Sequence, residues 1–232
     1  MKKMVLISLG MAACLLGTTP GFAELPPTSF QGEKITYAIK KFGLKAGEAT
    51  LEFKGPRVIE GRELLLIVFR ADGMNFLDEE NIYVDPATFL PARVDRDINI
   101  FGKKEKITER YDAVNGTVLI TKTAGDQVTR QTIKRNEVVD NIYCFIYRYR
   151  DKGNFAMNDE LGINLPTQNV RITLTKRDKV KAGGEEYNAF FMESQPKKYR
   201  LWFADDVNKT PLRIDGAVGF GSTSMIMTGY EK

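Results

Sequence analysis

Short segments of alternating apolar and polar residues, separated by turn signals, run along nearly the whole chain. About a dozen of them lie between residues 33 and 230, at the spacing that is typical of all-β domains. Asn115-Gly116 is a strong hairpin signal between the segments Ile107–Ala113 and Thr117–Thr123, because Asn and Gly readily adopt the positive φ angles of a tight turn. Strands connected in this way pair with their chain neighbours, so the pattern predicts an antiparallel sandwich or barrel.

One segment has helical periodicity instead. Asp140 is a suitable N-cap for a helix over Asn141–Asp151, and Gly153 is a suitable end. Arg148 and Arg150 mark the predicted solvent side. The predicted apolar face consists of Ile142, Phe145, Ile146 and Tyr149, and it is widened by Tyr143, Cys144 and Tyr147. A helix with this many aromatic residues has to be buried. In a chain that is otherwise β, we expect it to pack against the inside of a curved sheet.

The segment Glu63–Ala71 supports a sheet that is covered by other parts of the chain. Its two faces carry two apolar sets, Leu64, Leu66 and Val68 on one side and Leu65, Ile67 and Phe69 on the other. Both faces are therefore predicted to be covered. Most other strands alternate, which predicts a solvated outside and an apolar inside. The predicted fold is mainly β: an antiparallel curved sheet or open half-barrel of about a dozen strands, with the aromatic helix packed on the concave side.

The first 23 residues have the pattern of a secretory signal peptide. A basic start, Met1-Lys2-Lys3, precedes the apolar run Met4–Leu16, which is too short to span a bilayer. Gly21-Phe22-Ala23 then places small residues at the −3 and −1 positions of a cleavage site. The chain is predicted to be periplasmic, with a signal peptide over 1–23, a spacer over 24–29 and a single β-rich domain over 30–232.

Cys14 offers a different kind of processing. Met11-Ala12-Ala13-Cys14 partly matches the site at which bacterial lipoproteins are lipidated. However, Leu15 and Leu16 continue the apolar run, whereas a lipidated cysteine ordinarily opens a polar tether. The pattern therefore favours cleavage after Ala23 over a lipoprotein anchored through Cys14. The mature chain has no second apolar stretch long enough for a transmembrane segment.

Composition argues against several classes of function. Cleavage removes Lys2 and Lys3, so Lys+Arg falls from 34 to 32 against 30 Asp+Glu, and both signs are interspersed. Without a basic stripe, nucleic acid is not an expected partner. The chain has no histidine, the commonest general base and zinc ligand. We therefore expect a protein that is not an enzyme, with no catalytic residues, no metal and no cofactor.

Three groups of reactive side chains have ordinary structural interpretations. Cys144 lies among aromatic residues and is expected to be a buried, unreactive thiol. Asp95-x-Asp97-x-Asn99 begins like a calcium loop but lacks the glycine and glutamate that such a loop needs. The acidic runs Asp78-Glu79-Glu80 and Asp205-Asp206 are expected to be solvated residues of turns or sheet edges.

The order of several short motifs resembles the bacterial domain-of-unknown-function family 3108. The motifs are Phe30–Tyr37, Gly43–Ala49, Tyr83–Pro86, Pro91–Arg93, Val139-Asp140 with the aromatic helix, Leu201–Asp206, Pro211–Arg213 and Gly221-Ser222. They cover nearly all of the mature chain. The resemblance implies an exported, β-rich domain, and it offers no catalytic residue to transfer because the family has no settled activity.

These observations lead to two hypotheses about function. In the first, the half-barrel binds a hydrophobic ligand, an acyl chain or a lipid-bearing envelope component, beneath the helix. The predicted ligand-binding residues are Leu65, Ile67, Phe69, Ile142, Phe145, Ile146 and Tyr149. If the helix is a lid over ligand space, Phe145→Ala should cost less than about 2 kcal/mol of stability.

In the second hypothesis, the protein is an envelope assembly or scaffold protein that works without a ligand. An exposed strand edge, for which Lys198–Ala204 is the candidate, would then pair with a strand of a protein partner. A filled interior would favour this hypothesis, and a roomy apolar cavity would favour the first.

Overall fold

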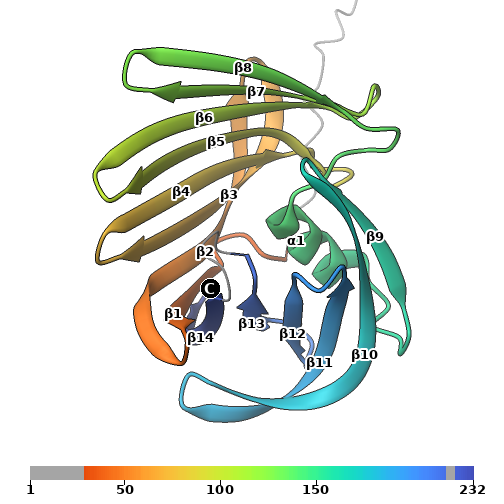
Figure 1. Cartoon of the computed structure of the whole chain (residues 1–232). Helices are drawn as coiled ribbons and strands as arrows, with labels where there is room; N and C mark the ends of the chain where they lie inside the picture. The colour runs from red at the N-terminus through yellow and green to blue at the C-terminus, as the bar shows by residue number, and fades with distance from the viewer. Residues whose placement is uncertain (1–28, 218–222) are drawn as a thin grey trace, which may run out of the picture.

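A computed structural model of the protein describes residues 29–217 and 223–232. Within these residues, fourteen strands form one antiparallel sheet, and one helix lies on its concave side (Figure 1). The strands are β1 (Lys34–Lys41), β2 (Leu44–Ile59), β3 (Arg62–Gly73), β4 (Phe76–Val84), β5 (Pro91–Ile100), β6 (Lys103–Asp112), β7 (Thr117–Ala124), β8 (Gln127–Lys134), β9 (Glu160–Leu165), β10 (Gln168–Ala182), β11 (Glu185–Gln195), β12 (Arg200–Ala204), β13 (Pro211–Asp215) and β14 (Thr223–Glu231). The helix α1 spans Ile142–Lys152. The predicted mainly β fold with one aromatic helix is confirmed. The predicted signal peptide, Cys14 and the spacer up to residue 28 lie outside the described residues.

The sheet consists of two meanders that meet at the pair β1–β14. One meander runs outward from β1 to β8, and the other runs from β14 to β9. The strands β8 and β9 are the two ends of the sheet, so it curves without closing on itself. The chain passes from one end to the other through α1, which lies inside the curve (Figure 1). The connectivity therefore puts the helix against strands of both meanders.

Register shifts give the sheet some of its curvature. One occurs in β2 between Phe53 and Gly55, opposite β3, and another occurs in β10 between Leu174 and Lys176, opposite β11. An extra residue on one strand of an antiparallel pair bends that strand and increases its twist. The long strands β2 and β10 can therefore wrap around the helix instead of lying flat.

Strand β3 shows how the alternating pattern produces the core. Leu65, Ile67 and Phe69 are fully buried in the same hydrophobic core as the apolar residues of α1. On the other face Leu64 is buried, whereas Leu66 and Val68 are half-buried. The prediction that both faces are covered is therefore confirmed for the concave face and holds only partly for the outer face.

The helix begins differently from the prediction. Asn141, not Asp140, is the N-cap, and its Oδ1 accepts a hydrogen bond of 2.8 Å from the backbone N–H of Tyr143. Asp140 is one residue too early for this role, and its carboxylate instead forms an ion pair with Arg148. The predicted end is correct, because the N–H of Gly153 donates to the carbonyl of Tyr149.

The prediction that Arg150 lies on the solvent side is wrong. Its side chain is buried, because the helix is enclosed by the curved sheet and contacts protein on more than one side. Arg148 is also partly covered, through its ion pair with Asp140. A helical pattern places charged residues opposite the apolar face, but it does not say whether that side reaches solvent.

Candidate hydrophobic-ligand site

The seven predicted ligand-binding residues are together in the structure, as parts of one continuous hydrophobic core. These residues are Leu65, Ile67, Phe69, Ile142, Phe145, Ile146 and Tyr149, and all of them are buried. Phe69 stacks on Tyr143 of the helix with ring centroids 4.5 Å apart, and Phe145 stacks on Tyr149 at 5.7 Å. The apolar faces of the helix and of β3 are therefore packed against each other. Among the described residues, two pockets lie on the rim of this core.

A buried ion pair fixes the C-terminal end of the helix. The guanidinium of Arg150 donates two hydrogen bonds of 2.6 Å to the two carboxylate oxygens of Glu33, just before β1. The same guanidinium donates to the carbonyl of Asn208, in the loop between β12 and β13, and lies 4.5 Å from the ring of Phe30. Arg150 thus joins the helix to both meanders, and this arrangement favours a fixed core helix over a lid.

The ion pair of Asp140 and Arg148 fixes the other end. Asp140 is buried, and the Nη2–Oδ2 distance is 2.5 Å. Arg148 also donates to the carbonyl of Phe89 in the β4–β5 connection, at 3.4 Å. The helix is therefore held at both ends by charged contacts that the chain must break before the helix can move.

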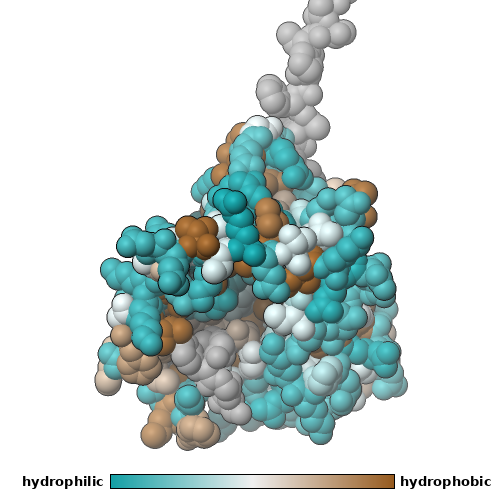
Figure 2. Space-filling model, turned by 45° about the horizontal axis from the view of Figure 1, so that its top comes forward, coloured by the Kyte–Doolittle hydropathy of each residue, from teal (hydrophilic) through white to brown (hydrophobic). Residues whose placement is uncertain are grey.

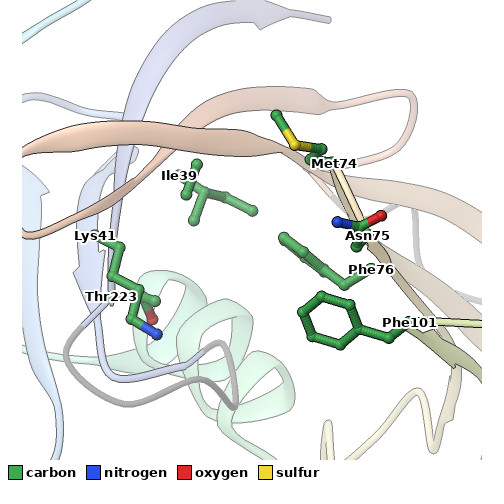
Figure 3. A pocket seen from close by; sticks show the side chains of 8 residues that line it. Ile39, Lys41, Met74, Asn75, Phe76, Phe101 and Thr223 are labelled. Atoms are coloured by element: carbon green, nitrogen blue, oxygen red, sulfur yellow. The ribbon is translucent and has the colours of Figure 1, made fainter.

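An apolar pocket of about 270 Å³ opens at one end of the strands (Figure 3). It is lined by residues of the strands β1, β2, β4 and β14 and of the hairpin turns β3–β4 and β5–β6: Ile39, Lys41, Ala46, Met74, Asn75, Phe76, Phe101 and Thr223. Figure 3 shows Ile39 and the rings of Phe76 and Phe101 facing the same space, with Lys41 and Thr223 on its other side.

The shape of this pocket depends on Gly73 and on the position of Phe76. A side chain at Gly73 would lie 2.2 Å from the ring of Phe76, so only glycine lets the ring take this position. Lys41 adds a positive charge at the rim. An apolar interior with one cationic side chain at its entrance suits an amphiphile with an anionic head.

A second depression, of about 350 Å³, lies between α1 and β9. It is bordered by Phe145, Arg148, Tyr149, Lys152, Gly153, Asn154, Asp159, Leu161 and Gly162. The hydroxyl of Tyr149 donates to the carboxylate of Asp159 at its edge, at 3.2 Å. Two predicted ligand-binding residues, Phe145 and Tyr149, border this depression, but its rim is more polar than that of the first pocket.

The acidic run Asp78-Glu79-Glu80 is not the turn or edge decoration that its sequence predicts. It lies in β4, inside the sheet, where the side chains of Asp78 and Glu80 share the face of buried Ile82. The guanidinium of Arg96 on β5 donates to Asp78 at 2.7 and 2.5 Å, and its Nε lies 3.4 Å from Glu80. Burial raises the pKa of Glu80 to about 7, since the neighbouring Arg96 offsets only part of the cost of desolvating the carboxylate.

This shift predicts that stability falls as pH rises. Between pH 4.5 and about 7 the folded chain holds the Glu80 proton that the unfolded chain has lost, so the free energy of unfolding decreases across this window. Glu80→Gln has no proton to lose, so its free energy of unfolding should fall less across this window, by up to roughly 3 kcal/mol. Denaturant unfolding from pH 4 to 8 gives the slope of the free energy of unfolding against pH for the wild type and for the variant, and the difference between these slopes measures the effect. Parallel slopes would contradict a shifted Glu80.

Cys144 and the calcium-like motif fit their structural interpretations. Cys144 is buried in the helix, and burial raises the pKa of its thiol well above its usual value. The motif lies in the regular strand β5. There Asp95 forms an ion pair with Arg93 of the same strand, and Asp97 forms one with Lys106 of β6. Among the residues that the structure describes, no group of His, Cys, Asp or Glu side chains is arranged to hold a metal ion.

The strand edge proposed from the sequence is wrong. Strand β12, which contains most of Lys198–Ala204, pairs with β11 on one side and with β13 on the other. The two ends of the sheet are instead β8 and β9. Alternation along one strand does not reveal its position in the sheet, because a central and an edge strand can have the same pattern of faces.

Sequence reasoning also missed the pocket at the hairpin turns. Its signal was two similar segments, Lys41-Phe42-Gly43-Leu44-Lys45 and Ile100-Phe101-Gly102-Lys103-Lys104. Each has a phenylalanine directly before a glycine in a tight turn, and a lysine directly next to this pair. Aromatic residues are uncommon at such positions, where Asn or Asp is preferred.

The known proteins to which this chain is similar have no assigned activity in their descriptions. A family model described as "Protein of unknown function (DUF3108)" matches residues 34–228. A search of curated proteins finds no match. A crystal structure described as "a putative lipoprotein from Parabacteroides distasonis ATCC 8503" has 8% sequence identity and a TM-score of 0.28, over 87% of this chain and 95% of that chain. Of the described residues, none forms a helix that is long and apolar enough to cross a membrane.

Proposed function

The chain belongs to the DUF3108 family, and because the description of that family assigns no function, we propose one from the site: this is an exported, non-enzymatic protein that binds a hydrophobic ligand. The ligand class is an acyl chain or a lipid-bearing envelope component. The observation that carries the proposal is the apolar pocket of about 270 Å³ that opens beneath the hairpin turns. Export is supported by the signal-peptide pattern of residues 1–23, which predicts a periplasmic protein.

The size and chemistry of the pocket suit part of an acyl chain. Its volume lies just below the range of roughly 300–1,000 Å³ that is usual for small-molecule sites. Each buried CH₂ group contributes about 0.8 kcal/mol, so a chain segment of several carbons would bind measurably. The described residues of the lining include no catalytic constellation, which supports a binding role.

Ligand binding can be tested with a variant that fills the pocket. Ala46 lines it, so Ala46→Phe should weaken binding of a fluorescent fatty acid to delipidated protein at least tenfold. The matched control is Ala113→Phe, in the exposed β6–β7 turn at the other end of the strands, and it should bind like the wild type. Equal binding by all three proteins would place the ligand elsewhere.

The same proposal predicts a copurifying ligand. Lipid extraction and mass spectrometry of protein isolated from the periplasm should identify acyl species in the wild type and much less in Ala46→Phe. Wild-type protein that carries no acyl species, and that acquires none from vesicles, would overturn the proposal.

A scaffold role is a second candidate, and the structure of β8 favours it. Nearly all residues of this end strand are exposed, and one of its edges has no sheet partner among the described residues. A strand of an envelope protein could pair there. Crosslinking in cells from a photoreactive residue at Thr129 should then capture a defined protein. Capture of none would argue against this role.

A further inference from the structure

Four large apolar side chains are exposed together at one end of the strands. Phe42, Leu44, Met74 and Phe101, here called the tip patch, are 86%, 76%, 94% and 75% exposed. Phe42, Met74 and Phe101 lie in the turns β1–β2, β3–β4 and β5–β6, and Leu44 is the first residue of β2. The three turns are neighbours because these six strands follow one another in the sheet. Figure 2 shows brown and tan residues at the left and lower left of the molecule, the side on which Figure 1 places these turns.

The two phenylalanines are held in an unfavourable backbone conformation. Phe42 has a φ of 52° and Phe101 a φ of 51°, and each precedes a glycine that also has a positive φ. This is the two-residue hairpin turn in which Asn-Gly is preferred, and a bulky residue in its first position is strained. Neither ring gains burial within the chain in return. The placement of two exposed aromatic rings at strained positions points to a contact outside the chain.

The charged residues around the tip patch indicate the chemistry of the surface that it contacts. The segments 40–46, 72–76 and 99–104 contain five lysines, Lys40, Lys41, Lys45, Lys103 and Lys104, and one acidic residue, Asp72. Asp72 is paired with Arg70 and Lys45 with Glu48, so the other four lysines supply the excess positive charge. Two exposed valines at the other end of the strands have acidic neighbours instead, with Val114 after Asp112 and Val207 after Asp205-Asp206. Apolar side chains that project from a basic rim fit an anionic lipid surface.

We propose that the tip patch docks this protein onto an anionic bilayer, with Phe42, Leu44, Met74 and Phe101 inserted at the interface and the surrounding lysines against lipid headgroups. Met74 and Phe101 also line the apolar pocket, so docking places the mouth of the pocket at the membrane surface. Docking goes beyond the proposed ligand binding and does not depend on it, because the patch contacts the bilayer whether or not the pocket is occupied.

The test is cosedimentation of the mature protein with vesicles. We expect binding to vesicles that contain phosphatidylglycerol, at least tenfold weaker binding to pure phosphatidylcholine, and a decrease with added salt. The double variant Phe42→Asn with Phe101→Asn should lose at least tenfold in binding. Asn suits the turn better than Phe, so this variant should unfold at no lower denaturant concentration than the wild type, and its loss of binding cannot be attributed to misfolding.

Two further variants complete the test. Phe42→Trp with Phe101→Trp should retain binding, because Trp also inserts at the interface. The matched control, Val114→Asn with Val207→Asn, removes two equally exposed apolar residues from the opposite end and should bind like the wild type. No binding by the wild type, or equal loss in the tip and control variants, would overturn docking. Fatty-acid binding by the Asn tip variant is measured separately, so failure of docking and failure of ligand binding are distinguishable.

Discussion

Glu33→Ala is expected to lower the free energy of unfolding by about 3 to 5 kcal/mol, the range for breaking a buried ion pair from one side. Both partners of this pair, Glu33 and Arg150, have side chains that are 1% exposed. Removal of the carboxylate leaves the guanidinium buried without a counter-charge, next to the carbonyl of Asn208 and the rings of Phe30 and Tyr147. Urea unfolding of the mature protein measures the loss.

The control for this prediction is a pair of the same charges at the surface. Glu48 forms an ion pair with Lys45, and both side chains are more than half exposed, so Glu48→Ala should change stability by at most about 1 kcal/mol. A second comparison replaces both buried partners, as Glu33→Leu with Arg150→Met. This variant should be more stable than Glu33→Ala, since it leaves no unpaired buried charge. A loss of less than about 1 kcal/mol for Glu33→Ala would mean that Arg150 reaches solvent and that the helix end is mobile.

Phe145→Ala is expected to cost about 3 to 5 kcal/mol, the range for truncation of a buried phenylalanine. This replaces the smaller loss, below about 2 kcal/mol, that a lid would give. The reason for the change is the position of Phe145, which is 2% exposed, stacks on Tyr149 and belongs to the continuous core. Denaturant unfolding of delipidated protein gives the value without a contribution from bound ligand.

A matched phenylalanine controls for the substitution itself. Phe42→Ala removes the same side chain from a turn where it is exposed, and it should change stability by no more than about 0.5 kcal/mol. If Phe145→Ala also cost less than about 2 kcal/mol, the helix would be a lid, and ligand space would lie beneath it. With the larger loss, the helix is a permanent part of the core and a ligand must bind at its rim.

The two outcomes for the helix bear directly on where a ligand binds. A fixed helix fills the concave surface between Leu65, Ile67 and Phe69 and the second meander, so these residues would act through packing. The pocket under the hairpin turns then offers a ligand an apolar space that is open to solvent. Its residues come from the ends of strands and from two turns, and sequence patterns do not say which strand ends and turns meet.

The antiparallel sheet and the helix followed from local chemistry. Alternation determines which side chains of β3 share a face, and tight-turn dipeptides such as Asn115-Gly116 connect strands that must pair as neighbours. The aromatic residues of Ile142–Lys152 require burial wherever the helix lies. These are properties of short segments, so the sequence by itself determined the fold class, the helix and most inward-facing residues.

Only the tertiary structure decided which charged side chains are buried, which strands are edge strands and which turns lie side by side. Arg150 and Glu33 are 117 residues apart in the chain, and nothing local distinguishes Arg150 from an ordinary solvated arginine. Asp78 and Glu80 likewise look like surface acids until β4 is placed between β3 and β5. Phe42, Met74 and Phe101 come together because every second hairpin of an antiparallel meander turns at the same end of the strands. Burial and proximity depend on the arrangement of all fourteen strands, and no single segment contains that information.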